Sequence, residues 1–433
     1  MSDTQRAVRL RPSQWSVGRH TNWRHGTQAQ RLALITPLAQ PQVAGLVALA
    51  IYLLRALLSP DELRRTSTAY FNFLADAFLH GQMHLRFVPT NIADLVYYGD
   101  RIYLYWPPFP ALVVMPLVAL FGTGVSDVLY TAVFTAISVA LLAKLLQVLD
   151  HADIAPLNSE RRAIIVATMA FGSVLLILAP VGRVWHTAQV IGWICALLAT
   201  IAALTRKDTW GYFLVGLALA GATTSRTGML FNGVWLAYYM LRRDRARPRG
   251  KQFLAALCGL APIAGALLAQ GWYNWARFGH PLDMGLKWHK VSDFFRADFE
   301  RYGTFSLHYL PNNLYYEFVN YTVFTQQQWL GGGLFWMTPV LLGAPVAVWL
   351  YRRNTIIWAL LLSCALTYIP IGLCMGTGYI TFGPRYLLDL MVPIIVLTAI
   401  GIRRWRLDVL YLLLAVSCVT YVIGSTMWAL LVY

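Results

Sequence analysis

Carboxylate and imidazole side chains gather in one polar segment, residues 59–126, of a chain that is otherwise strongly apolar. Asp76 and His80 stand four residues apart in a stretch with helical spacing, so they share one face of the predicted helix. A carboxylate beside a histidine can act as a general base, with the histidine orienting it or sharing its proton. The alternative is an amphipathic helix whose polar face only meets water. Asp94 follows in the same segment, and no turn motif accounts for it.

The tyrosine-rich run around Asp100 has the pattern of a β-hairpin. Gly99 and Asp100 stand where a two-residue turn would place them. Arg101, beside this turn, is also a candidate ligand for an anion. Tyr105 and Trp106 end the run, and we expect their rings to line a cavity between lipid and water.

A second candidate cluster combines positive charge with aromatic rings. Lys287 and His289 flank Trp288 in another polar segment, residues 272–333. Cations interleaved with aromatic side chains beside a membrane suit a lipid phosphate or the face of a sugar. The alternative is a surface belt, because Trp and Lys collect at membrane interfaces in any case.

The composition predicts that membrane helices position these residues. Hydrophobic residues make up 58% of the 433 residues and charged residues only 12%, whereas a soluble domain carries about 25% charged residues. Each span needs roughly 20 apolar residues, which leads us to expect eleven spans. They are expected at roughly 41–58, 127–149, 162–181, 187–205, 210–224, 228–241, 252–272, 334–350, 355–374, 387–402 and 408–431.

The basic residues predict the orientation of these spans. The net charge of +16 comes mainly from short connections that the positive-inside rule assigns to the cytoplasm, so no nucleic-acid partner is expected. A basic tail, residues 1–40, is then cytoplasmic and precedes one transmembrane domain, residues 41–433. Residues 59–126 and 272–333, the first and second outer loops, face the opposite side. Successive connections alternate between the two sides of the membrane only if the proline-rich stretch 107–122 lies in the membrane interface and does not cross.

Three arginines fall on the outer rim, where the positive-inside rule disfavours them: Arg183, Arg226 and Arg385. Arg385 also opens a predicted span, and a helix N-terminus is itself a phosphate site that an arginine strengthens. We therefore expect these arginines to bind an anion. Tyr386, beside Arg385, is expected to join the aromatic lining.

Neither the cysteines nor any motif of soluble enzymes suggests a competing site. The five cysteines lie inside or at the rim of predicted spans and lack the spacing of metal ligands. The chain contains no P-loop, dinucleotide-binding, HExxH or GxSxG motif. No cofactor is predicted. A divalent metal is compatible with the sequence, but no ligand set predicts one.

The order of these parts resembles the GT-C superfamily of membrane glycosyltransferases, especially the bacterial family 39-like proteins. The matching stretches are YFNFLADAFLHGQMHL, YLYWPPFPALVVMPLVALFG, YNWARFGHPLDMG followed by GTFSLHYLPNNLYY, and FGPRYLLDL. The resemblance implies an all-α, GT-C-like bundle of about eleven transmembrane helices in the bacterial inner membrane, with interfacial helices in two long extracytoplasmic loops. It also implies a sugar donor carried on a polyprenyl phosphate, an acidic base in the first outer loop, and inversion at the anomeric carbon.

The chain departs from the family pattern at two places. Family members usually carry an acidic pair just before the position of Tyr70, where this chain has Thr66 and Ser67. Many relatives also carry a lysine before the double proline, where this chain has Trp106. The roles of the family's base and of its phosphate-binding lysine therefore cannot be assigned directly to residues of this chain. The candidates for the base are, in order of preference, Asp76, Asp94 and Asp61.

The leading hypothesis is a membrane enzyme in which the hydroxyl of a lipid or glycan acceptor attacks the anomeric carbon of a polyprenyl-phosphate sugar. The base removes the proton, and arginines stabilise the leaving phosphate. A transporter of a lipid-linked glycan is the alternative from another class, but it would need ionisable residues near the bilayer midplane, and the predicted spans contain almost no acids. A third hypothesis is a non-catalytic assembly partner with a GT-C fold.

Overall fold

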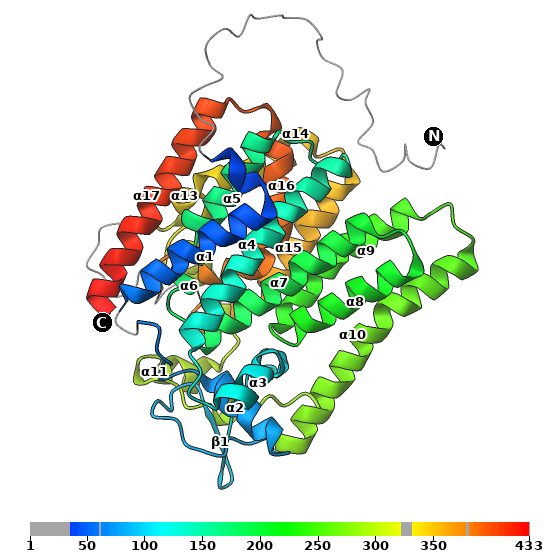
Figure 1. The fold of residues 1–433 in the computed structure, drawn as a ribbon. Helices are drawn as coiled ribbons and strands as arrows, with labels where there is room; N and C mark the ends of the chain where they lie inside the picture. Colours follow the sequence, from blue (N-terminus) through cyan, green and yellow to red (C-terminus); the bar gives the residue numbers. More distant parts are fainter. Residues whose placement is uncertain (1–34, 60–61, 322–330, 378–380, 433) are drawn as a thin grey trace, which may run out of the picture.

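The fold is a bundle of helices with one β-hairpin (Figure 1). The computed structural model describes residues 35–59, 62–321, 331–377 and 381–432. Its α-helices are α1 (Pro41–Leu57), α2 (Tyr70–Leu79), α3 (Phe109–Phe121), α4 (Asp127–His151), α5 (Ser159–Phe171), α6 (Leu175–Leu178), α7 (Val184–Thr205), α8 (Thr209–Thr223), α9 (Gly233–Arg243), α10 (Arg249–Phe278), α11 (Asp293–Tyr302), α12 (Leu310–Leu314), α13 (Leu334–Met337), α14 (Gly343–Tyr351), α15 (Thr355–Leu373), α16 (Met391–Gly401) and α17 (Leu407–Val432). The hairpin pairs β1 (Val96–Tyr98) with β2 (Arg101–Tyr103) in antiparallel register.

The helices have the length and hydropathy of membrane spans. Six helical stretches of the described chain are long and apolar enough to cross: Asp127–His151, Val184–Thr205, Arg249–Phe278, Thr355–Leu373, Arg385–Arg404 and Leu407–Met427. Four shorter apolar helices accompany them: Pro41–Leu57, Phe109–Phe121, Thr209–Thr223 and Pro339–Tyr351. The predicted class, an all-α polytopic membrane protein, is therefore confirmed. The number of eleven spans stays a prediction.

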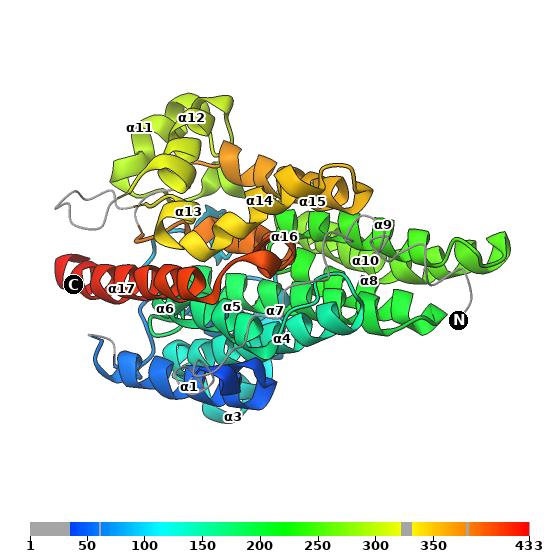
Figure 2. The same ribbon diagram turned by 90° about the horizontal axis from the view of Figure 1, so that it is seen from above.

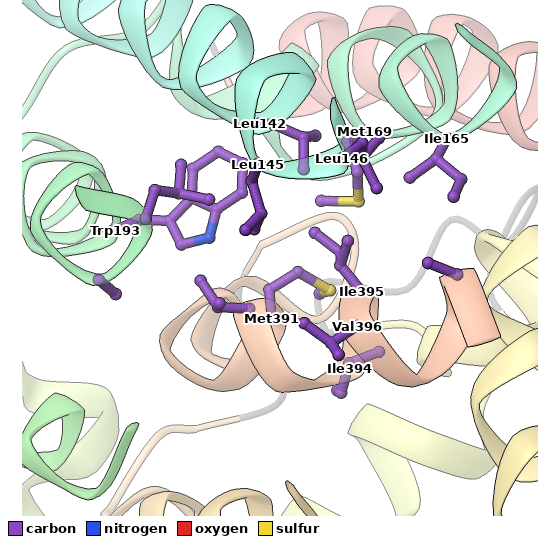
Figure 3. Close-up of a cluster of buried hydrophobic side chains, with 14 of the residues drawn as sticks. Leu142, Leu145, Leu146, Ile165, Met169, Trp193, Met391, Ile394, Ile395 and Val396 are labelled. Atoms are coloured by element: carbon purple, nitrogen blue, oxygen red, sulfur yellow. The ribbon is translucent and has the colours of Figure 1, made fainter. Parts of the chain in front are cut away.

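Apolar side chains from four helices pack together at the centre of the bundle (Figure 3). α4, α5 and α7 meet α16 there, and the stretch that contains α16 is 89% buried inside the protein. Lipid tails are as apolar as leucine, so such helices associate through close packing. The labelled side chains are Leu142, Leu145, Leu146, Ile165, Met169, Trp193, Met391, Ile394, Ile395 and Val396.

α10 lies at the rim of the bundle, as Figures 1 and 2 show, and is fixed to it through α8. Gly216 of α8 approaches Gly259 of α10 so closely that a Cβ on Gly216 would lie 1.9 Å from the carbonyl oxygen of Gly259. Small residues allow such contacts between membrane helices. At the other end of α10, the buried Arg277 donates from Nη1 to the carbonyl oxygen of Leu104 at 2.7 Å. α10 thereby holds the first outer loop just before Tyr105.

The first outer loop is fastened to the bundle by buried Asp127 at the start of α4. Asp127 Oδ1 accepts from the backbone N–H of Thr66 at 2.7 Å. Asp127 Oδ2 accepts from Thr66 Oγ1 at 2.6 Å and from the backbone N–H of Arg183 at 2.8 Å. Thr66 therefore has a structural partner in this chain.

A second buried polar residue, Asn72, fixes α2 to α4 and to the segment before it. Its Nδ2 donates to the carbonyl oxygen of Val125 at 2.7 Å, and its Oδ1 accepts from the Tyr130 hydroxyl at 2.9 Å. The N-terminal part of the α2 side that carries Asn72 is therefore covered by the segment between α3 and α4.

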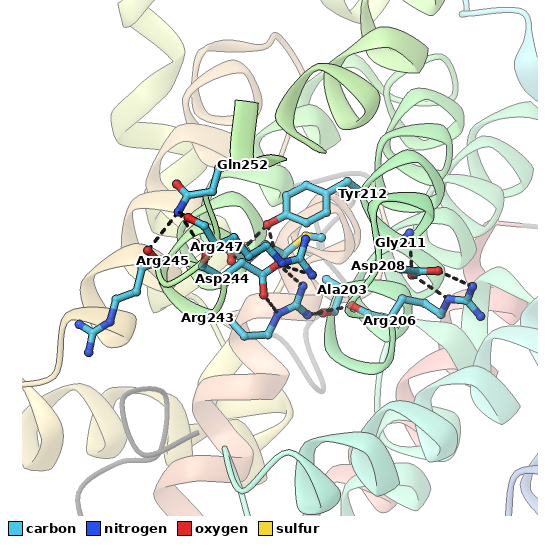
Figure 4. Close-up of polar contacts among 11 residues, drawn as sticks. Ala203, Arg206, Asp208, Gly211, Tyr212, Arg243, Asp244, Arg245, Arg247 and Gln252 are labelled. Atoms are coloured by element: carbon cyan, nitrogen blue, oxygen red, sulfur yellow. Dashed lines mark hydrogen bonds and ion pairs between the residues drawn. The ribbon is translucent and has the colours of Figure 1, made fainter. Parts of the chain in front are cut away.

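The basic connection between α9 and α10 is organised around Asp244 (Figure 4). The Asp244 carboxylate accepts from the Tyr212 hydroxyl at 2.8 Å and pairs with Arg243 at 2.8 Å and Arg247 at 3.4 Å. Gln252 Nε2 donates to three backbone carbonyl oxygens of the same connection. One acid thus neutralises part of a densely positive turn that is expected to face the cytoplasm.

Candidate functional site

The two outer loops are joined by backbone hydrogen bonds beside the β-hairpin. Asp94 N–H donates to the Lys290 carbonyl oxygen at 3.2 Å, and Lys290 N–H donates to the Leu95 carbonyl oxygen at 2.9 Å. Val96 of β1 forms an antiparallel bridge with His289. This pairing brings His289 of the second loop to Asp94 of the first.

The carboxylate of Asp94 is held by two N–H donors. Asp94 Oδ1 lies 2.9 Å from His289 Nε2, and Asp94 Oδ2 accepts from Trp185 Nε1 at 2.9 Å. An ionised carboxylate can accept about four hydrogen bonds, and the Asp94 side chain keeps 27% of its surface exposed. The backbone φ of Asp94 is +62°, a strained conformation of the kind that clusters at functional sites. Asp94 therefore has the environment of an accessible, oriented base.

His289 carries its proton on Nε2 in this pair. The Asp94 carboxylate can only accept a hydrogen bond, so the atom facing it must be the donor. The other ring nitrogen, Nδ1, is buried and has no hydrogen-bond partner among the described residues. This assignment follows from the hydrogen-bond pattern.

Aromatic rings connect the Asp94–His289 pair to Arg226. The ring of Tyr105 lies 4.8 Å from that of His289 and stacks on Trp106 at 5.2 Å. The guanidinium of Arg226 lies 5.4 Å from the centre of the Trp106 ring. Burial first, and then the charge of Asp94, raise the pKa of Tyr105 well above its ordinary value, so its hydroxyl remains protonated and can donate. Ring contacts therefore link the Asp94–His289 pair to Arg226, while a cavity lined by these rings stays a prediction.

Arg226 and Arg385 both contact the Tyr386 ring, but their guanidinium groups differ in hydrogen bonding. Arg226 is 5.2 Å from the Tyr386 ring and donates from Nε to Asp389 Oδ2 at 2.9 Å, which gives it a buried counter-ion. Arg385 lies 4.4 Å from the same ring. Its Nε and Nη1 are buried and have no hydrogen-bond partner within the described ranges.

The backbone of Arg385 is fixed by Gln189 of α7. Gln189 Nε2 donates to the Arg385 carbonyl oxygen at 3.0 Å and to Asp389 Oδ1 at 3.0 Å. A buried charged donor without a partner is costly. Within the described ranges, Arg385 therefore has buried N–H groups that are free to donate to an anion, whereas Arg226 already donates to a carboxylate.

Asp76 and His80 are brought together as predicted, but in a separate group on the surface of α2. Asp76 Oδ1 lies 3.6 Å from His80 Nδ1. Asp76 Oδ2 lies 3.1 Å from Arg86 Nη1, so the carboxylate already has a cationic partner. Asp61, the third candidate base, lies outside the described residues.

The other predicted anion ligands lie outside this cluster or act through their backbone. Lys287 is 63% exposed and pairs with Asp283 at 3.2 Å. Arg101 is exposed at the hairpin turn, where Tyr98 pairs with Arg101. The hairpin prediction is thereby confirmed. Arg183, with φ of +71°, contributes its backbone N–H to Asp127.

Four residues in or beside the cluster were not identified from the sequence: Trp185, Gln189, Asp389 and Glu317. Asp389 follows Arg385 by four residues within the FGPRYLLDL stretch, so its position was an available signal. Glu317 is fully buried in the second outer loop. Within the described part of the chain, no three His, Cys, Asp or Glu residues are grouped as a metal site would require.

No protein-family model and no curated protein sequence matches the chain. Among solved structures, it is similar to the crystal structure of ArnT from Cupriavidus metallidurans bound to undecaprenyl phosphate, with 14% sequence identity and a TM-score of 0.45. The match covers 84% of this chain and 60% of that one. The chain thus spans less than two thirds of the length of that protein.

Proposed function

We propose that this protein is a membrane glycosyltransferase that moves a sugar from a polyprenyl-phosphate donor to the hydroxyl of a lipid or glycan acceptor at the extracytoplasmic face. The observation that carries the proposal is the continuous contact from Asp94 and His289, through Tyr105 and Trp106, to the arginine pair around Tyr386. Displacement at an anomeric carbon requires a base on one side and anion stabilisation on the other. In this proposal Asp94 is the base and the arginines stabilise the anion.

The proposed reaction is a single displacement. The acceptor hydroxyl oxygen forms a bond to the anomeric carbon while its proton passes to the Asp94 carboxylate. The bond from that carbon to the donor phosphate oxygen breaks, and its electron pair stays on the phosphate. Arg385 and Arg226 stabilise the added negative charge, which is the usual way that preorganised cations lower such a barrier. One displacement from the opposite face inverts the configuration of the anomeric carbon.

His289 and Trp185 have positioning roles in this proposal. Their N–H groups hold the two oxygens of Asp94 in one orientation. A base that is fixed before the substrate arrives needs less reorganisation in the transition state. Asp94 is the residue that receives the proton.

The test is release of polyprenyl phosphate by the full-length protein in lipid nanodiscs. The donors are undecaprenyl phosphates that carry glucose, galactose, mannose or arabinose, and the acceptor is a detergent extract of bacterial membrane lipids and glycans. We expect one donor to yield polyprenyl phosphate and a glycosylated acceptor, with the anomeric configuration inverted. Movement of a lipid-linked sugar between leaflets without release would favour the transporter instead.

A further inference from the structure

Glu317 is a buried acid that the proposed displacement does not use. It is the central residue of a five-residue π-helical turn, Tyr315–Val319, which continues α12 in the second outer loop. Its side chain is fully buried, and neither carboxyl oxygen has a hydrogen-bond partner among the described residues. π-helical turns are rare and occur frequently at functional sites.

Backbone hydrogen bonds fasten this turn to the segment that precedes Arg385. Gly332 N–H donates to the Tyr316 carbonyl oxygen at 2.9 Å. Gly383 N–H donates to the Gly331 carbonyl oxygen at 2.8 Å. Glu317 and Arg385 therefore belong to one connected part of the site.

Two further buried polar atoms near Glu317 also have no partner in the described structure. Asn313 precedes Glu317 by four residues, and its Nδ2 donates to the carbonyl oxygens of Gly372 and Cys374 at 2.9 Å each, which leaves Oδ1 unpaired. The Tyr368 hydroxyl likewise has no hydrogen bond of ordinary length among the described residues, although it lies close enough to the Glu317 carboxyl group to interact with it. Burial raises the pKa of Glu317 to about 8, whereas the contact with Tyr368 and the charge of Arg385 lower it.

These unpaired atoms indicate what kind of ligand would satisfy them. Buried polar groups nearly always have partners, and leaving one unpaired is costly. A protonated carboxyl group can both donate and accept, a phenol can do the same, and an amide oxygen accepts. Neighbouring hydroxyl groups match this set, because each hydroxyl also donates and accepts.

We propose that Glu317, Tyr368 and the Oδ1 atom of Asn313 bind hydroxyl groups of the transferred sugar and so determine which sugar is accepted. This inference rests on the proposed glycosyltransferase function. A site built to hydrogen-bond a hydroxyl group discriminates strongly against ligands that lack it, because its own polar groups are then left unpaired. Glu317 and its neighbours would select the sugar, while Arg385 would hold the phosphate.

The experiment compares a phosphate lipid with and without a sugar. Farnesyl phosphate, and farnesyl phosphates carrying glucose, galactose, mannose or arabinose, are titrated against the full chain in nanodiscs with tryptophan fluorescence as the readout. We expect the wild type to bind one sugar-bearing lipid about tenfold or more tightly than farnesyl phosphate. Glu317→Met should reduce this preference to about twofold or less and leave the affinity for farnesyl phosphate within about twofold.

Controls separate the inference from a folding defect and from failure of the proposed function. Glu300→Gln changes an exposed acid of α11 and should keep the sugar preference. Glu317→Met should melt no lower than the wild type, because it removes an unpaired buried group. If it melts lower, Tyr368→Phe replaces it as the test variant, and the same loss of preference for the sugar-bearing lipid is expected. If the test variant keeps the preference for the sugar-bearing lipid, Glu317 and its neighbours do not select the sugar, and the transferase proposal stays intact. A wild type that prefers no sugar-bearing lipid would overturn both.

Discussion

His289 Nε2 lies 2.9 Å from Asp94 Oδ1, although the two residues are 195 positions apart in the chain. The contact exists because the second outer loop pairs its backbone with the segment next to β1. The candidate base and its histidine therefore assemble only when both outer loops have folded against each other. Separate folding of either loop would leave Asp94 without this partner.

Replacing Asp94 tests the base. Asp94→Asn keeps the size of the side chain but cannot take up the acceptor proton, so sugar transfer should fall by about 10²–10⁴. Donor binding should persist, because the arginines are unchanged. Initial rates of polyprenyl phosphate release, together with donor titrations, measure the two effects.

Asp76→Asn and Asp61→Asn are the matched controls for this experiment. Asp76 already pairs with Arg86 on the surface of α2, and its variant should retain transfer close to the wild-type rate. If Asp76→Asn loses transfer and Asp94→Asn does not, the base belongs to the α2 group. Full activity in all three variants would exclude these three aspartates as the base.

Arg385→Lys tests recognition of the phosphate. Lysine keeps the charge but loses the planar pair of N–H donors that matches two phosphate oxygens. We therefore expect weaker donor binding, by about tenfold if one charge-assisted hydrogen bond of roughly 1.4 kcal/mol is lost. Titration with farnesyl phosphate measures this. Arg101→Lys, at the exposed hairpin turn, should bind as the wild type does, and unchanged binding by Arg385→Lys would assign Arg385 to structure.

Asp127→Ala tests the anchor of the first outer loop. The substitution removes the acceptor for Thr66 and for the Arg183 backbone, and the donors left buried should cost about 1–3 kcal/mol of unfolding free energy. Thermal unfolding in detergent should show a lower midpoint. Asp408→Ala removes an exposed acid paired with Arg406 and should change the midpoint little, because exposed ion pairs contribute about 0–1 kcal/mol. Equal midpoints for both variants would refute the anchor.

Cysteine labelling tests the orientation of the bundle. A cysteine at position 247 lies in the basic connection before α10, and one at position 293 lies at the start of α11 in the second outer loop. A membrane-impermeant maleimide added to intact cells should label position 293 only. Position 247 should react only after the cells are opened. Labelling of both positions from one side would contradict the prediction that they lie on opposite sides of the membrane.

The stability of the protein should depend on pH through Glu317. Its pKa is raised to about 8 in the fold, against an ordinary value of 4.5, so between these pH values the folded state holds a proton that the unfolded chain has lost. Stability therefore falls as pH rises from about 5 to 8, and the full penalty is present above 8. The groups that act on Glu317 are Tyr368, Asp389 and Arg385.

Glu317→Gln removes this titration. Its melting temperature should decrease less than that of the wild type between pH 6 and pH 9, and at pH 9 the variant should be the more stable of the two. Differential scanning fluorimetry at both pH values measures the difference. Parallel pH profiles for the two proteins would show that Glu317 is ionised throughout this range.

The sequence by itself determined the class of the protein and its local turns. Apolar stretches separated by short basic connections are enough to predict a polytopic helical membrane protein, because hydropathy acts on each segment independently. The hairpin at Gly99 and Asp100 was predictable for a similar reason, since a turn depends on a few adjacent residues.

The tertiary structure alone decided which acid meets a histidine of the other outer loop and which arginine keeps two N–H groups without a hydrogen-bond partner among the described residues. Helical spacing relates Asp76 only to residues within a turn or two, and it could not indicate that Arg86 pairs with Asp76 or that His289 reaches Asp94. The sequence was equally unable to indicate which buried atoms of Arg385 and Glu317 lack a hydrogen-bond partner in the described part of the chain, because burial and hydrogen bonding depend on how distant segments pack. Chemistry assembled across two loops therefore depends on contacts that local patterns do not encode.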